Sequence, residues 1–239
     1  MSRYQVTTLF GRPFLTDPDD TLDLLKWGTY EPDESALIRG VLDKKSFALD
    51  IGAHIGYYTS LMLDTGARVA AFEPNPLNYA FLSYNCKGDA SLYKTALSDH
   101  YGEIDMHLSP VNSGDDTLYP FDDSDRVKVK VHCAELDTID LLGEPTFIKM
   151  DIQGGEYRAL LGMNETLSRG KVKHMAIEFY PEALRAADSD PAEMLRFLWN
   201  HGFALYEVHE GHGTMDGINI GILSRPDMQN GYINLWCVR

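Results

Sequence analysis

The chain has 239 residues, a length that suits one α/β domain better than two ordinary ones. Its 36 acidic and 21 basic residues give a formal net charge of −15, which disfavours binding to nucleic-acid backbones and anionic lipids. No apolar stretch approaches the roughly 18 residues of a membrane-spanning helix, and the first residues lack the apolar core of a signal peptide. We therefore expect a cytoplasmic protein with no nucleic-acid or membrane partner; the oligomeric state stays open.

Residues 1–45 form an N-terminal strand and helix segment that we expect to pack on the core. Residues 4–10 predict a short strand, and residues 21–27 predict a short helix. A second helix begins at Pro32 and runs to about Leu42, because proline and the acidic Asp33 and Glu34 suit a first helical turn.

Residues 46–239 alternate between strand and helix patterns. Short apolar strands are predicted at 47–51, 68–72, 91–95, 146–150 and 173–179, and helices at 57–64, 76–86, from 156, and at 191–201. This order predicts a Rossmann-like α/β fold with a doubly wound, mostly parallel sheet.

Two further features interrupt that order. Residues 103–108 and 127–132 alternate apolar and polar side chains around a polar loop at 110–124, which predicts a small inserted β-hairpin. Segments 204–208 and 232–238 have only loop between them and predict an antiparallel C-terminal edge strand.

The cofactor site is expected beyond the carboxyl end of the first strand, where such sheets bind ligands. The sequence there is Asp50-Ile51-Gly52-Ala53-His54-Ile55-Gly56. Gly52 permits a tight turn near a ligand, and Gly56 lets the next helix start close to the strand. Glu73 ends the next strand, where a carboxylate accepts hydrogen bonds from both hydroxyls of an adenosine ribose.

The alternative cofactor is a nicotinamide dinucleotide. Its fingerprint is Gly-x-Gly-x-x-Gly, whereas this loop has Gly-x-x-x-Gly preceded by Asp50. A carboxylate there repels a pyrophosphate but can pair with the ammonium of S-adenosylmethionine, directly or through water. The pattern favours S-adenosylmethionine as the cofactor.

At this point the sequence resembles the FkbM family of class I S-adenosylmethionine-dependent methyltransferases. The resemblance spans about residues 31–180 and rests on blocks in the family's order: Leu49 to Thr59, Ala71-Phe72-Glu73-Pro74-Asn75-Pro76, Ala96-Leu97-Ser98-Asp99, Leu136-Asp137, Phe147 to Glu156, and Ile177-Glu178. It implies methyl transfer to a small-molecule or glycan hydroxyl, on a sugar, polyketide or related metabolite.

Together, the motifs and the resemblance give a set of expected cofactor-binding residues: Asp50, Gly52, Ala53, His54, Gly56, Tyr57, Tyr58, Thr59, Glu73, Pro74, Asn75, Ala96, Leu97 and Asp151.

The candidate catalytic residues are Asp151, Glu156, Lys149 and Glu178. Asp151 is the first candidate for the base that takes the acceptor's proton, and ordering the methionine end of the cofactor is its alternative role. Glu156 lies at a predicted helix start, where a favourable interaction of its carboxylate with the helix dipole explains it as well as a catalytic role does. Lys149 in a buried strand is expected to pair with Asp151 or Glu156, and Glu178 either reaches the acceptor or braces the site.

One position departs from the family pattern. The family usually has Asp-x-Glu-Gly-x-Glu, and this chain has Asp151-Ile152-Gln153-Gly154-Gly155-Glu156. Gln153 keeps the length of glutamate but carries no charge and takes no proton at neutral pH. A cofactor-binding module without catalysis is therefore a second hypothesis, and an NAD-dependent oxidoreductase is a third.

No metal site is expected. His209-Glu210-Gly211-His212 does not match the helical His-Glu-x-x-His pattern, and its glycine indicates a loop. Four aromatic residues flank the expected site: Trp27, Tyr30, Tyr57 and Tyr58. They either form a wall against the acceptor or pack in the apolar core.

Overall fold

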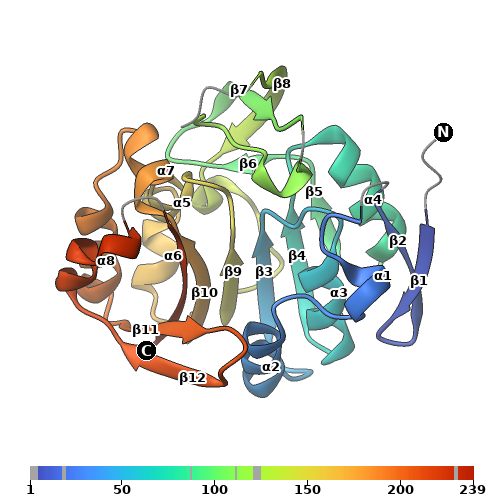
Figure 1. Ribbon diagram of the computed structural model, residues 1–239, viewed down its shortest axis with the longest axis horizontal. Helices are drawn as coiled ribbons and strands as arrows, with labels where there is room; N and C mark the ends of the chain where they lie inside the picture. Colours follow the sequence, from blue (N-terminus) through green and yellow to red (C-terminus); the bar gives the residue numbers. More distant parts are fainter. Residues whose placement is uncertain (1–4, 18–19, 87, 111, 121–124, 229–230) are drawn as a thin grey trace.

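The computed structural model describes residues 5–17, 20–86, 88–110, 112–120, 125–228 and 231–239. Eight strands form its central sheet in the order β12-β11-β13-β10-β9-β3-β4-β5 (Figure 1). Their bounds are β3 Phe47–Ile51, β4 Arg68–Phe72, β5 Ser91–Tyr93, β9 Phe147–Met150, β10 His174–Phe179, β11 Ala204–His209, β12 Thr214–Gly217 and β13 Ile233–Val238.

The pairing confirms the predicted fold class. Strands β5, β4, β3, β9 and β10 run parallel, and β13 is antiparallel to both β10 and β11. The C-terminal strand was expected at the edge of the sheet, but β13 lies inside it. The reason is that β11 continues into β12 through a hairpin, and β12 takes the edge.

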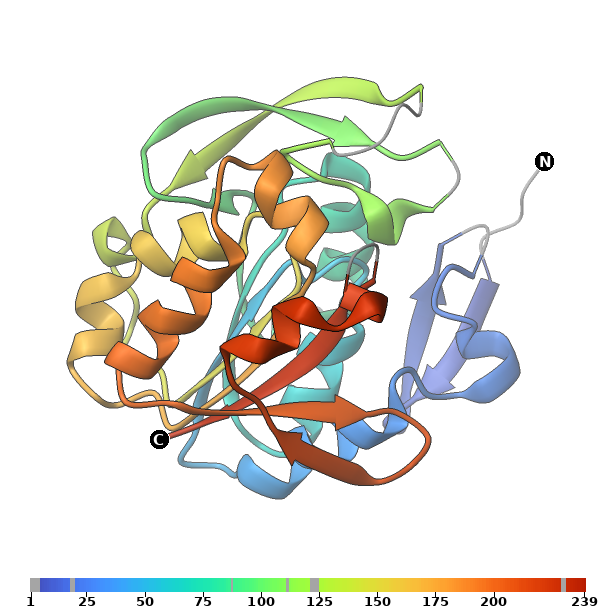
Figure 2. The same ribbon diagram turned by 60° about the vertical axis from the view of Figure 1, so that its left-hand side comes forward.

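Helices cover both faces of the sheet (Figure 2). On one side lie α2 (Pro32–Val41), α3 (Tyr57–Asp64) and α4 (Pro76–Cys86). On the other lie α5 (Glu156–Leu161), α6 (Asn164–Ser168), α7 (Pro181–Ala186) and α8 (Pro191–Asn200). Each face has its own apolar core: Ile38, Leu61 and Met62 belong to the first, and Leu160, Leu167 and Leu195 to the second. The two layers bury the sheet on both sides, as a parallel sheet requires.

The predicted inserted hairpin is present. β7 (Gly102–Leu108) pairs antiparallel with β8 (Val127–Ala134), and β6 (Ala96–Leu97) joins them in a separate three-stranded sheet. Figure 1 shows this sheet above the carboxyl ends of β3 and β4. Within the loop expected at 110–124, Val111 and residues 121–124 lie outside the described residues.

The N-terminal segment contains one strand more than expected. β1 (Gln5–Leu9) forms a hairpin with β2 (Arg12–Thr16), and α1 spans Leu24–Trp27. Tyr4, the expected start of the first strand, lies outside the described residues. Pro13 weakens the strand signal of β2, but a proline is tolerated on an edge strand that has a single neighbour.

Within the described residues, no helix combines the length and apolar character needed to cross a bilayer. The three cysteines, Cys86, Cys133 and Cys237, are free and buried.

The His209-Glu210-Gly211-His212 segment binds a helix terminus. The Glu210 carboxylate accepts hydrogen bonds from the backbone amides of Asp33 (3.0 Å) and Glu34 (2.7 Å), at the start of α2. In return, the Asp33 carboxylate accepts from the amides of Gly211 (2.6 Å) and Gly213 (3.1 Å). The β11–β12 hairpin therefore caps α2 from 177 residues away in the chain.

We expect Glu210→Ala to lower the free energy of unfolding by about 1 kcal/mol, the usual cost of a lost N-terminal cap. Glu210→Gln keeps one carbonyl acceptor and should lose less. Urea unfolding of the three proteins measures both effects, and equal stability of Glu210→Ala and wild type would contradict the assignment.

Candidate active site

A cavity of about 460 Å³ lies at the carboxyl ends of the central strands. This volume is within the range of cofactor and substrate pockets. Side chains from the loops after β3, β4, β9 and β10 line it, together with the segment 112–118 between β7 and β8. The cavity therefore occupies the place predicted from strand order, but residues of the inserted hairpin complete it.

The glycine loop is fixed by a close approach to the neighbouring strand. Gly52 has φ of +83°, and a Cβ there would lie 1.9 Å from the backbone oxygen of Asp151. The amides of Gly52 and Ala53 both donate to the carbonyl of Phe72 at 3.0 Å. The sequence analysis attributed Gly52 to a tight turn near a ligand. In the structure, a side chain at this position would collide first with the loop after β9.

Glu73 is a buried carboxylate at the cavity wall, 4% exposed. It accepts hydrogen bonds from the backbone amides of His54 and Asn75, each at 2.8 Å. Burial raises the pKa of Glu73 to about 8, although these two amides oppose the shift. Two carboxylate oxygens offer about four acceptor sites, so the group keeps acceptor capacity for the two ribose hydroxyls of an adenosine.

The segment 112–118 is held against this half of the cavity. The ring Nε2 of His54 lies 2.8 Å from the hydroxyl of Ser113, and the amide of Asn75 donates to Asp116 at 2.6 Å. Burial lowers the pKa of His54 to about 4, so its ring is neutral at physiological pH. The apolar side chains of Leu97 and Met106 face the same half of the cavity.

A buried ion cluster lies at the other half. The Lys149 ammonium on β9 is 2.9 Å from the Glu34 carboxylate of α2 and 3.6 Å from the Asp151 carboxylate. Burial alone would lower the pKa of Lys149, but the charges of Glu34 and Asp151 raise it well above its usual value. Burial raises the pKa of Glu34 to about 7 against the effect of Lys149. The expected pairing of Lys149 with Asp151 is present, and its second partner is Glu34 rather than Glu156.

Gln153 joins two carboxyl groups at this half. Its side-chain nitrogen donates to Asp151 at 3.0 Å and to Glu178 at 2.9 Å. Glu178 is buried at the end of β10, and burial, followed by the charge of Asp151, raises its pKa well above its usual value. Glu156 instead accepts from the backbone amides of Ile152 and Gly154, and it does not line the cavity.

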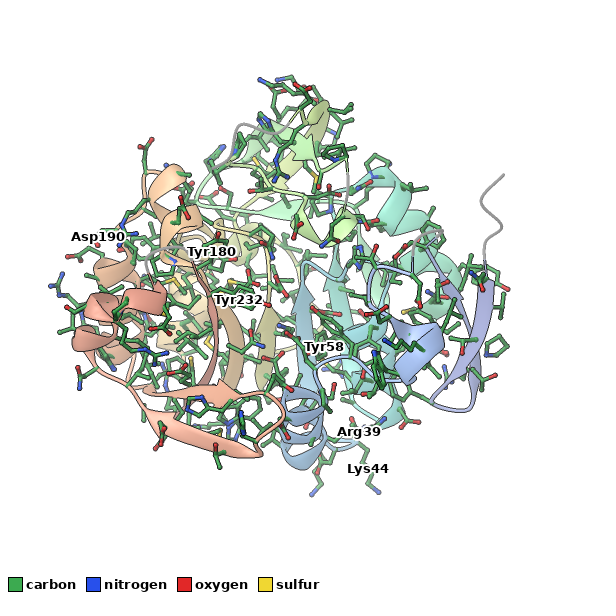
Figure 3. The ribbon with its side chains drawn as sticks, viewed as in Figure 1. Arg39, Lys44, Tyr58, Tyr180, Asp190 and Tyr232 are labelled. Carbon is green, nitrogen blue, oxygen red and sulfur yellow. The ribbon has the colours of Figure 1, made fainter. Side chains whose placement is uncertain are left out.

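Tyrosines surround the carboxyl groups. Tyr30, Tyr58, Tyr180 and Tyr232 line the cavity, and the ring of Tyr58 lies 4.8 Å from the Lys149 ammonium. Figure 3 shows Tyr58, Tyr180 and Tyr232 over the central strands, whereas Arg39 and Lys44 lie at the rim of the molecule. The rings of Tyr180 and Tyr232 are 6.2 Å apart, so they form one aromatic wall.

Most of the predicted site residues line the cavity: Gly52, Ala53, His54, Tyr57, Tyr58, Glu73, Pro74, Ala96, Leu97, Lys149, Asp151 and Glu178. Five others lie behind this layer: Asp50, Gly56, Thr59, Asn75 and Glu156. The Asp50 carboxylate accepts from the Thr59 hydroxyl and is 1% exposed, so contact between Asp50 and a cofactor ammonium stays a prediction.

Three groups of cavity residues were not foreseen. They are Thr21 and Leu22 before α1, residues 112–116 with Leu118 and Arg126, and the pair Tyr180 and Tyr232. Thr21, Leu22, residues 112–116 and Tyr232 lie in segments with no local motif, and these segments reach the cavity through the packing of the N-terminal segment, the inserted hairpin and β13. Tyr180 instead directly follows the parallel strand β10. The pattern of strand ends predicts a site only for the parallel strands themselves.

The family comparison decides between the methyltransferase and the oxidoreductase. A profile described as the Methyltransferase FkbM domain matches residues 50–205, well over half of the chain. The chain belongs to the FkbM methyltransferase family. The cofactor of the chain is therefore S-adenosylmethionine, and the acceptor capacity of Glu73 and the close-packed glycine loop are compatible with its binding in this cavity.

Similar proteins agree with this assignment. The Hexuronic acid methyltransferase AglP of Haloferax volcanii is 26% identical over 171 residues, which cover 70% of this chain and 67% of that protein. A solved FkbM methyltransferase from Methylobacillus flagellatus KT has a TM-score of 0.52 at 20% identity, and the match covers 84% of this chain and 45% of that one. The chain thus spans less than half of that solved protein.

The fold likeness extends to a more distant enzyme. A TehB-like SAM-dependent methyltransferase from Corynebacterium glutamicum has a TM-score of 0.50 at 11% identity, with 91% of this chain and 92% of that chain covered. At such identities the likeness concerns the fold alone.

The buried carboxyl groups predict an unusual pH dependence of stability. Glu73 titrates near pH 8 in the folded protein but near 4.5 when unperturbed. Between these values the native state binds more protons than the unfolded state, so stability falls as pH rises. Burial likewise raises the pKa of Asp50 to about 6 and that of Glu156 to about 7, so both groups add to the loss of stability as pH rises.

We therefore expect the melting temperature without cofactor to be higher at pH 5 than at pH 8. Glu73→Gln mimics the protonated group. Its free energy of unfolding should therefore match that of wild type at pH 5 and exceed it at pH 8 by on the order of 2 kcal/mol. Melting curves from pH 5 to 9 measure this, and parallel curves for the two proteins would contradict it.

Proposed function

We propose that this protein transfers the methyl group of S-adenosylmethionine to a hydroxyl of a sugar, polyketide or related small metabolite. The observation that carries the proposal is the meeting, in one cavity, of the buried Glu73 carboxylate and the Asp151 carboxylate beside Lys149. S-adenosylmethionine supplies a methyl group on a sulfonium, and transfer requires the acceptor oxygen to be aligned with it. The residues around Asp151 would provide that alignment.

The acceptor half of the cavity suits a neutral polyhydroxylated molecule. Gln153 and Glu178 offer hydrogen-bonding groups to neighbouring hydroxyls, and Tyr180 and Tyr232 offer aromatic surface for the apolar face of a sugar ring. The relative named for a hexuronic acid acceptor supports a sugar-like substrate class.

Asp151 is the residue that we assign as the base. An alcohol is a weak nucleophile, so a carboxylate within reach must accept its proton as the new bond forms. The Asp151 side chain is 26% exposed, lines the cavity and lies 3.6 Å from the Lys149 ammonium. An amine acceptor would need less help from a base than an alcohol does. The alternative role of Asp151 is to order the methionine end of the cofactor.

Asp151→Asn should lower kcat by about 10²- to 10⁴-fold, the usual contribution of a general base. The amide keeps the shape of the side chain, so affinity for S-adenosylhomocysteine should change little. Asp140→Asn, at an exposed position, is the matched control. Activity retained in Asp151→Asn would instead indicate an amine acceptor or the ordering role.

Cofactor binding is tested first by calorimetric titration with S-adenosylhomocysteine. Glu73→Ala should weaken binding by about 1–3 kcal/mol, the cost of leaving hydrogen-bonding groups unpaired. NAD serves as the control ligand. Folded protein that fails to bind S-adenosylhomocysteine would overturn the proposal, and binding without turnover of any tested alcohol would favour a non-catalytic module.

A further inference from the structure

The side chain of Gln153 lies between two carboxyl groups that would otherwise face each other. A single NH₂ group has two hydrogens, and its nitrogen is 3.0 Å from Asp151 Oδ1 and 2.9 Å from Glu178 Oε2. Each carboxyl group therefore receives one donor from the same amide. The two groups come from different strands, because Asp151 follows β9 and Glu178 lies on β10.

The backbone fixes the direction of this side chain. Gln153 has φ of +52°, a region that residues other than glycine adopt only where the surroundings enforce it. The Thr117 hydroxyl donates to its carbonyl at 2.7 Å. Gly154 packs so tightly on α7 that a Cβ would lie 2.6 Å from the Ala183 oxygen. The loop is held from both sides, so the position of the amide is set by the fold.

Among the described residues, the nearby Lys149 ammonium forms an ion pair with one of these two carboxyl groups and not with the other. Lys149 is 3.6 Å from Asp151, but its shorter contact, 2.9 Å, is with Glu34. Glu178 has no ion pair with Lys149 among the contacts between described residues. Two buried carboxyl groups in one site repel each other when both are ionised, unless a donor or a cation lies between them.

We propose that Gln153 is a positioning residue that holds Asp151 and Glu178 together, in the place that a divalent cation or a shared proton would otherwise take. This inference rests on the proposed role of Asp151 as base. Gln153 itself transfers no proton, since an amide neither gains nor loses one at neutral pH. Its two N–H groups donate one hydrogen bond to each carboxyl group and thereby fix the distance between the two side chains.

A glutamate at position 153 has the same shape but no N–H group. Gln153→Glu would place three carboxyl groups around one point, which is a donor set that hard divalent cations prefer. The variant should therefore bind a divalent cation more tightly than wild type does. Gln5→Glu adds the same charge at an exposed position of β1, outside the cavity, and is the matched control.

The first experiment titrates Mn²⁺ into the full chain by calorimetry, without cofactor or acceptor. Gln153→Glu should bind Mn²⁺ at least tenfold more tightly than wild type and Gln5→Glu do. Equal affinity of Gln153→Glu and wild type, including undetectable binding by both, overturns the proposal. The result does not depend on activity, so it is independent of the S-adenosylhomocysteine titration that tests the proposed function.

The second experiment separates positioning from simple packing. Gln153→Leu fills the same space without donors, so the pKa of Glu178 should rise further in the folded state. Its loss of melting temperature relative to wild type should then be larger at pH 8 than at pH 5, by about 2–4 °C or more. An equal loss at both pH values would indicate packing alone and overturn the positioning role.

Discussion

The buried ammonium of Lys149 is the charge around which one half of the cavity is arranged. It is 1% exposed and lies within 4 Å of carboxylates from α2 and from the loop after β9. A buried charge without a partner is very unfavourable, and removing one member of such a pair typically costs about 3–5 kcal/mol. The position of α2 against the sheet and the position of Asp151 are therefore coupled through one side chain.

This coupling makes the N-terminal segment a part of the site rather than an addition to the core. Tyr30 lines the cavity, Glu34 pairs with Lys149, and Glu31 accepts hydrogen bonds from Tyr58 and Asn234. The cap of Glu210 on α2 brings the C-terminal hairpin into the same arrangement. Segments from both ends of the chain thus support a cavity whose wall otherwise belongs to the central strands.

The inserted hairpin has a comparable role at the half of the cavity that contains Glu73. Its connecting segment contacts the glycine loop through His54 and Ser113, the Glu73 loop through Asn75 and Asp116, and the Gln153 loop through Thr117. These three contacts place one segment across both halves of the cavity. Two of the contacted residues, His54 and Gln153, have positive φ values, which is a strained backbone conformation for residues other than glycine.

The sequence by itself determined the parallel sheet, the glycine loop, Glu73 and the Asp151 block, because these depend on residues close together in the chain and on the rule that parallel strands end at one edge. It also identified Lys149 as a charge needing a partner, but not Glu34 as that partner. Only the tertiary structure decided which acids lie at the cavity surface and which brace its loops. Glu34, Ser113 and Tyr232 reach the site through long-range packing, and such packing leaves no periodic signal in the sequence.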